Sequence, residues 1–138
     1  MAQDREDIAN RLRALPLESR GVVMAVLFGS VARGESGENS DVDVAFLLEE
    51  PFDPMVKLDL IADAQRALGT DAVDIVVMNG LTDEQPLLAV RILAEGMILL
   101  DRDPSARIDY HIRALGMADD ARHLMRITDD AMRERPRG

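Results

Sequence analysis

The stretch LFGSVARGESGENSDVDVAF, residues Leu27 to Phe46, joins two apolar segments through a polar turn. The second segment begins with Asp41 and Asp43, two positions apart, and strand periodicity places both carboxylates on the same face. Carboxylates this close raise one another's pKa unless a cation intervenes. An isolated pair of this kind is more typical of a solvated acidic turn, whereas a pair within a larger site is typical of Mg²⁺ binding.

The end of the first apolar segment has the features of an anion-binding turn. Gly29-Ser30 follows the segment directly, and VARG after it predicts the first turn of a helix. Backbone N–H groups at a helix N-terminus attract phosphate, and glycine allows a close approach. An ordinary turn with Ser30 as the helix cap is the alternative. A Walker-type loop is excluded, because Glu35 stands where that loop requires lysine.

A third aspartate, Asp74, interrupts another apolar segment. An unpaired buried charge at this position would be costly. If this segment pairs beside the strand that carries Asp43, the three aspartates share a face and form a site for two cations, as in phosphoryl or nucleotidyl transfer. The alternative is that Asp74 lies at a sheet edge and faces water, as we expect for Asp71.

Apolar runs rich in β-branched residues predict three buried strands, at Val22–Phe28, Val42–Leu48 and residues 72–78, and a short edge strand at residues 97–100. A first helix places Ile8, Leu12 and Leu15 on one face and ends at Pro16. The sequence therefore predicts an α/β fold with a small mixed sheet flanked by helices.

Three further helices have start or stop signals. Asp53-Pro54 begins one that ends at Gly69, with an apolar face of Met55, Leu58, Ile61 and Leu68. Residues 82–85, TDEQ, form a capping box for a helix that ends near Gly96. Asp103-Pro104 begins a long C-terminal helix with Ile108, Ile112 and Leu115 on one side.

Composition limits the class of protein. The chain has 138 residues, enough for one domain spanning residues 1–138, and 47% of them are hydrophobic. Aromatic residues make up 3% and the net charge is −10, which argues against direct nucleic-acid binding. The chain has no cysteine, its charged N-terminus does not resemble a signal peptide, and it has no membrane-length apolar run. We expect a cytoplasmic protein without a membrane partner.

The pattern from Gly29-Ser30, through ten residues, to Asp41-Val42-Asp43 resembles the signature of the polymerase-β-like nucleotidyltransferases. VARGE after Ser30, and Ser40 before the first aspartate, resemble the small prokaryotic branch. The short chain and the run LLAVRILAEGMILLDRD are similar to the minimal nucleotidyltransferases of the MntA antitoxin type. The resemblance covers most of the chain.

The resemblance implies a nucleotidyltransferase fold and specific roles for the residues. Gly29 and Ser30 would hold the distal phosphates of ATP, and Arg33 would contribute to ATP binding. Asp41, Asp43 and Asp74 would bind two Mg²⁺ ions. In the MntA group, AMP passes to a tyrosine hydroxyl of a HEPT-family toxin, which is thereby silenced in the toxin–antitoxin pair. Homo-oligomers or hetero-oligomers with the toxin are compatible with this.

Two alternatives remain open at the level of sequence. One is a nucleotidyltransferase that modifies a small molecule such as an aminoglycoside. The other is an antitoxin that acts by binding alone, with a silent site. Arg91 is expected at the surface, although a phosphate or partner contact is an alternative. His111 and His123 lack metal-ligand spacing, so we interpret both as helix-surface or packing residues.

Overall fold

The computed structural model describes residues 4–35 and 41–133, with side-chain exposure described to residue 128. Ser40 lies outside the described residues. The elements follow the order α1 (Arg5–Arg13), β1 (Val22–Phe28), α2 (Gly29–Ala32), β2 (Val42–Leu48), α3 (Met55–Leu68), β3 (Val73–Val77), α4 (Leu81–Glu84), α5 (Pro86–Glu95), β4 (Met97–Asp101) and α6 (Pro104–Arg133).

The four strands form one mixed sheet in the order β3-β2-β1-β4. Strand β1 pairs antiparallel with β2 and with β4, whereas β2 pairs in parallel with β3. The predicted α/β class and the mixed sheet are therefore confirmed. The predicted first two strands match β1 and β2, while β3 is shorter than predicted by one residue at each end.

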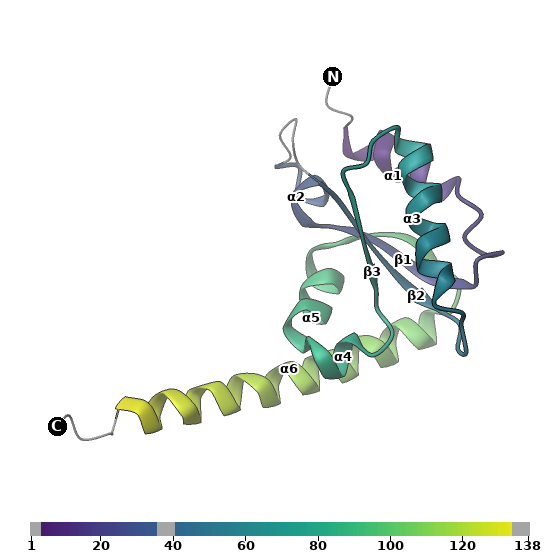
Figure 1. Ribbon diagram of the computed structural model, residues 1–138. Coiled ribbons are helices and arrows are strands. Elements are labelled where there is room, and N and C mark those ends of the chain that lie inside the picture. Colours follow the sequence, from purple (N-terminus) through teal and green to yellow (C-terminus); the bar gives the residue numbers. More distant parts are fainter. Residues whose placement is uncertain (1–3, 36–40, 134–138) are drawn as a thin grey trace.

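Helices cover both faces of the sheet, which explains why the strands read as continuous apolar runs. Helices α1 and α3 lie side by side on one face, and α4, α5 and α6 cover the other (Figure 1). The first core contains residues of α1, α3 and alternate strand positions, including Leu12, Val44, Phe46, Leu60 and Ile75. The second core contains Met24, Val26, Ala45, Met78, Leu81, Ala89, Ile92 and Ala114.

The predicted capping box at residues 82–85 is wrong. The chain makes two helices here, because Gln85 has φ −141° and ψ 68° before Pro86, which begins α5. Thr82 is buried inside α4, where its hydroxyl accepts a hydrogen bond from Arg113 Nε at 3.3 Å. A threonine that packs inside a turn cannot also cap it.

Two predicted apolar helix faces differ from the observed ones. Helix α3 buries Leu60, Ala64 and Leu68, whereas the predicted Met55 and Leu58 are more than half exposed. The fully buried Ala64 and Leu60 lie near the centre of α3, and Met55 and Leu58 lie in its first turn.

Helix α6 buries Ala114 and Ala118 against α4 and α5, and it leaves Ile112 and Leu115 exposed. Its C-terminal half extends beyond the sheet (Figure 1). Alanines let the helices approach closely, so the small residues mark the buried side. Across residues 4–35 and 41–133, no helix combines the length and apolarity that a membrane crossing requires.

Candidate active site

A row of side chains crosses three strands at one end of the sheet. In the register, Phe28 of β1 is opposite Asp43 of β2, and Asp43 is opposite Asp74 of β3. Residues paired in this way project from the same face of a sheet. The predicted juxtaposition of Asp43 and Asp74 is thus confirmed at the level of strand register.

Asp74 also meets the alternative expectation, because it is exposed on an edge strand. It avoids the cost of a buried charge by facing solvent while remaining beside Asp43. Asp41 is exposed and lies one residue before β2 begins at Val42, so it stands outside the paired part of the strand.

Gly29 packs directly against Asp43. The glycine has a φ of +78°, a backbone conformation that L side chains rarely adopt. A Cβ added there would lie 3.0 Å from Asp43 Cγ and would collide with Asp43 Oδ2. Two independent constraints therefore require glycine at the turn from β1 into α2, and Ser30, the next residue, lines the same cavity as Asp43.

The electrostatic surroundings of Asp43 are predominantly negative. Partial burial raises the pKa of Asp43, and the nearby Asp74 and Asp41 raise it further, while Arg33 lowers it. The ionised Asp43 carboxylate is therefore repelled by Asp74 and Asp41, and the attraction of Arg33 does not offset this repulsion and the cost of burial. Charge of this kind is what a divalent cation would neutralise.

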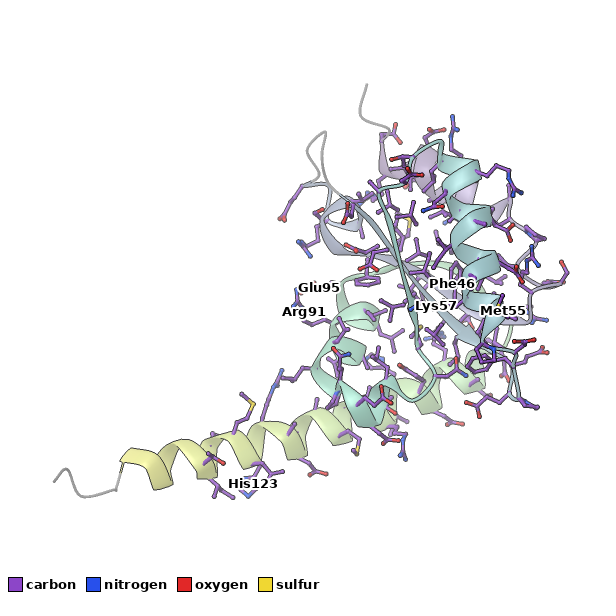
Figure 2. All side chains as sticks on the ribbon, in the orientation of Figure 1. Phe46, Met55, Lys57, Arg91, Glu95 and His123 are labelled. Carbon is purple, nitrogen blue, oxygen red and sulfur yellow. The ribbon has the colours of Figure 1, made fainter. Side chains whose placement is uncertain are left out.

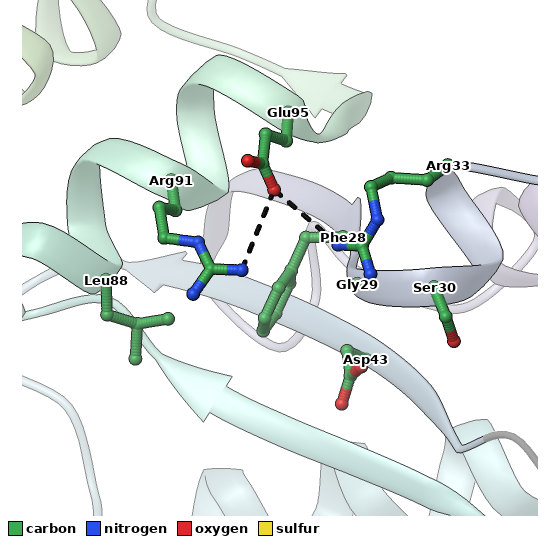
Figure 3. Close-up of a pocket in the computed structure, with 8 residues that line it drawn as sticks. All are labelled: Phe28, Gly29, Ser30, Arg33, Asp43, Leu88, Arg91 and Glu95. Atoms are coloured by element: carbon green, nitrogen blue, oxygen red, sulfur yellow. Dashed lines mark ion pairs between the residues drawn. The ribbon is translucent and has the colours of Figure 1, made fainter. Parts of the chain in front are cut away.

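A cavity of about 390 Å³ opens beside Asp43, within the size range of small-molecule sites. Its lining combines an apolar wall with polar and charged groups: Phe28, Gly29, Ser30, Arg33, Asp43, Leu88, Arg91 and Glu95 (Figure 3). The structure thus brings together four predicted site residues in one cavity. Asp41 and Asp74 do not line it.

Helix α5 supplies Leu88 and Glu95, which the sequence did not identify as site residues, and Arg91, whose place in the cavity agrees with the alternative to a plain surface role. Glu95 pairs with Arg33, directly after α2, at 3.6 Å and with Arg91 of α5 at 3.9 Å (Figure 3). Arg91 and Glu95 are four residues apart, a spacing that is common for surface ion pairs on helices. The one feature of the sequence that could have pointed to Glu95 as a site residue is its position immediately before Gly96, at the junction with the next strand.

The oxygen donors fit a hard cation such as Mg²⁺, because all three predicted ligands are carboxylates. In the part of the chain that the structure describes, however, no group of three or more acidic or histidine side chains is already gathered closely enough to hold a metal ion. Figure 2 shows His123 on the projecting part of α6, away from Arg91 and Glu95 of α5.

The fold and site place the protein in a defined class. The model of the family described as polymerase beta, nucleotidyltransferase, matches residues 10–105, and the chain belongs to this family. A solved structure of a proposed minimal nucleotidyltransferase is 34% identical, with a TM-score of 0.60, over 69% of this chain and 95% of that one.

Structures of toxin–antitoxin complexes are similar in fold. One, solved with AMP-PNP, is 24% identical with a TM-score of 0.63, over 94% of this chain and 99% of that chain. Another, of the tri-AMPylated Shewanella oneidensis HEPN toxin with its MNT antitoxin, is 21% identical with a TM-score of 0.68, over 93% and 98%. No protein of curated function matches the sequence significantly.

Proposed function

We propose that this protein is a Mg²⁺-dependent adenylyltransferase that transfers AMP from ATP to a tyrosine hydroxyl of a HEPT-family toxin, and so acts as the antitoxin of the pair. The acceptor oxygen forms a bond to the α-phosphorus of ATP, and the bond to the leaving pyrophosphate breaks. The acceptor hydroxyl loses its proton in the same reaction. We further propose that the reaction takes place in the cytoplasm.

The observation that carries this proposal is the row of carboxylates beside the cavity. Asp43 is held against Gly29 on one side and stands beside Asp74 on the other. The cavity next to it is large enough for a small-molecule ligand and contains two arginines that can attract phosphate. A nucleotide fits this combination of apolar wall, cationic side chains and acidic edge.

Asp41, Asp43 and Asp74 would hold two Mg²⁺ ions. When bound, these would offset charge on the phosphates and lower the pKa of the attacking hydroxyl. Gly29 and Ser30 would orient the distal phosphates through backbone N–H groups and the serine hydroxyl. Arg33 would add a charge-assisted hydrogen bond to the same phosphates.

A toxin as acceptor is supported by the fold of the similar structures. Those solved as toxin–antitoxin complexes cover nearly the whole of this chain, and one of them contains a toxin described as tri-AMPylated.

Intact-mass spectrometry of the toxin encoded beside this chain tests the proposal. After incubation with this protein, ATP and Mg²⁺, we expect the toxin to gain the mass of one or more AMP units on tyrosine. Asp41→Ala and Asp43→Ala should abolish the gain. Asp71→Ala is the matched control, because Asp71 is an exposed acid just before β3 and should be dispensable. Unchanged modification by the Asp43→Ala protein would refute the proposed chemistry.

A further inference from the structure

Glu95 is placed where an anionic ligand of the cavity would lie. Its Oε2 atom is 3.6 Å from Arg33 Nη1 and 3.9 Å from Arg91 Nη2, so one carboxylate oxygen lies between an arginine that directly follows α2 and an arginine of α5. Arg33 also pairs through Nε with Glu35 at 3.1 Å, so Glu95 neutralises the Nη1 side of its guanidinium. Figure 3 shows the carboxylate between the two guanidinium groups, at the rim of the cavity that Asp43 also lines. Without a ligand, the two cationic groups are thus partly neutralised from within the chain.

The helix dipole does not favour Glu95 at its position on α5. Glu95 is the last residue of α5, where the helix dipole is negative and a basic residue would be favourable. The last turn of α5, all of it described, contains no basic residue, and the partner of Glu95 within the helix is Arg91, one turn earlier, which also lines the cavity. An acidic residue at a helix C-terminus goes against the helix dipole, and such an unfavourable choice at the edge of a site indicates a role in that site.

The backbone next to Glu95 is closely packed. A Cβ on the following residue, Gly96, would collide with Ile92 O and Val26 Cγ1 and would lie 3.1 Å from Leu27 O. The end of α5 is therefore packed against β1 immediately before the Phe28–Gly29 turn. Glu95 is therefore presented to the cavity from a closely packed position, with a side chain that is partly exposed to solvent.

The ion pairs around Glu95 are of a kind that exchanges readily. The side chains of Arg33, Arg91 and Glu95 are 36%, 65% and 43% exposed, and exposed ion pairs contribute little net free energy. A polyphosphate offers several oxygen acceptors and more negative charge than one carboxylate, so it binds arginine more strongly.

We propose that Arg91 is a second phosphate-binding arginine of the nucleotide site and that Glu95 is its resident counter-anion, which the phosphates of ATP displace from between Arg33 and Arg91. This rests on the proposed function, and it adds to it a residue pair on α5 that controls phosphate affinity. Binding then exchanges one anion for another between the same two guanidinium groups.

The test compares Glu95→Gln with Glu18→Gln by calorimetric titration with ATP, inorganic tripolyphosphate and adenosine, at one ionic strength and with Mg²⁺ present. Both substitutions remove one negative charge, but Glu18 lines a separate cavity near the start of β1. We expect Glu95→Gln to tighten binding of ATP and tripolyphosphate about three- to tenfold. Adenosine, which has no phosphate to compete with Glu95, should bind with unchanged affinity, and Glu18→Gln should match the wild type.

Arg91→Gln provides a second, independent variant. It should weaken ATP and tripolyphosphate binding by at least about threefold and leave adenosine binding unchanged. The inference is overturned if Glu95→Gln binds tripolyphosphate no more tightly than the wild type, or if Arg91→Gln binds it equally well. If the wild type transfers AMP but the two variants do not change tripolyphosphate binding as expected, the roles of Glu95 and Arg91 are refuted and the proposed function stands. If neither the wild type nor any variant binds ATP, the proposed function is refuted as well.

Discussion

The interior of the sheet and its charged end contribute to the stability of the fold in opposite directions. In the interior, strand residues are apolar toward both faces, and Phe46 is fully buried between β2 and the α1–α3 layer. At the end where β1 turns into α2, a glycine with positive φ is pressed against Asp43, beside another acid. The interior stabilises the fold, whereas the charged end costs stability, and residues that cost stability are expected where a ligand binds.

The largest expected effect lies in the interior. Phe46→Ala removes a fully buried aromatic ring, and we expect a loss of about 3–5 kcal/mol in the free energy of unfolding. Phe52→Ala is the control, because Phe52 only packs against the edge of the same core. Urea denaturation measures both. Equal losses for the two variants would show that the interior is not the stabilising region.

At the charged end, Gly29→Ala separates the two constraints on that glycine. Gly34 has a similar φ of +73° but open space around its Cβ position, so Gly34→Ala should cost only the backbone strain, about 1–2 kcal/mol. Gly29→Ala should cost about 1–3 kcal/mol more, because its Cβ collides with Asp43. The excess should shrink in the Gly29→Ala, Asp43→Ala double variant. A persistent excess would point to another cause.

Removing the Asp43 charge should stabilise the metal-free fold. Because the pKa of Asp43 is raised in the folded state, by burial first and by Asp74 and Asp41 next, its ionisation opposes folding. Below the ordinary pKa of aspartate both states are protonated, and the cost is absent. It appears as pH rises through the folded pKa.

Asp43→Asn should therefore melt above the wild type at pH 7 in EDTA, and the difference should vanish toward pH 3. Differential scanning calorimetry across this range measures the trend. An Asn variant that melts lower at pH 7 would contradict the view that the charged end is destabilising.

The smallest effect is expected outside both regions. Ile112 is 64% exposed on α6, so Ile112→Ser should change the free energy of unfolding by no more than about 0.5 kcal/mol. Chemical denaturation of the isolated protein measures this. A loss comparable with that of Phe46→Ala would mean that this face of α6 is covered in the free protein.

The sequence predicted the parts of the molecule that depend on local pattern. Continuous apolar runs indicated β1 and β2 at their observed bounds, and the spacing of Asp41 and Asp43 indicated the acidic edge. The sequence placed Asp74 beside Asp43 only if β2 and β3 paired with each other. The structure shows this parallel pairing, which the sequence did not predict. Strand order depends on contacts far apart in sequence, so a single sequence leaves it open.

Features that depend on packing between helices were missed. The large residues Ile112 and Leu115 suggested the buried side of α6, yet close helix packing selected Ala114 and Ala118. The sequence did not single out Glu95, because only the tertiary fold brings Arg33 to it. The same lack of long-range information hid the contribution of α5 to the cavity.

The most direct test of the account is a crystal structure with Mn²⁺ and a non-hydrolysable ATP analogue, examined for anomalous scattering. We predict metal peaks bound to carboxylate oxygens of Asp41, Asp43 and Asp74, with the triphosphate in the cavity beside Gly29. A bound nucleotide without metal at these aspartates, or Asp74 directed away from the other two, would contradict the central claim.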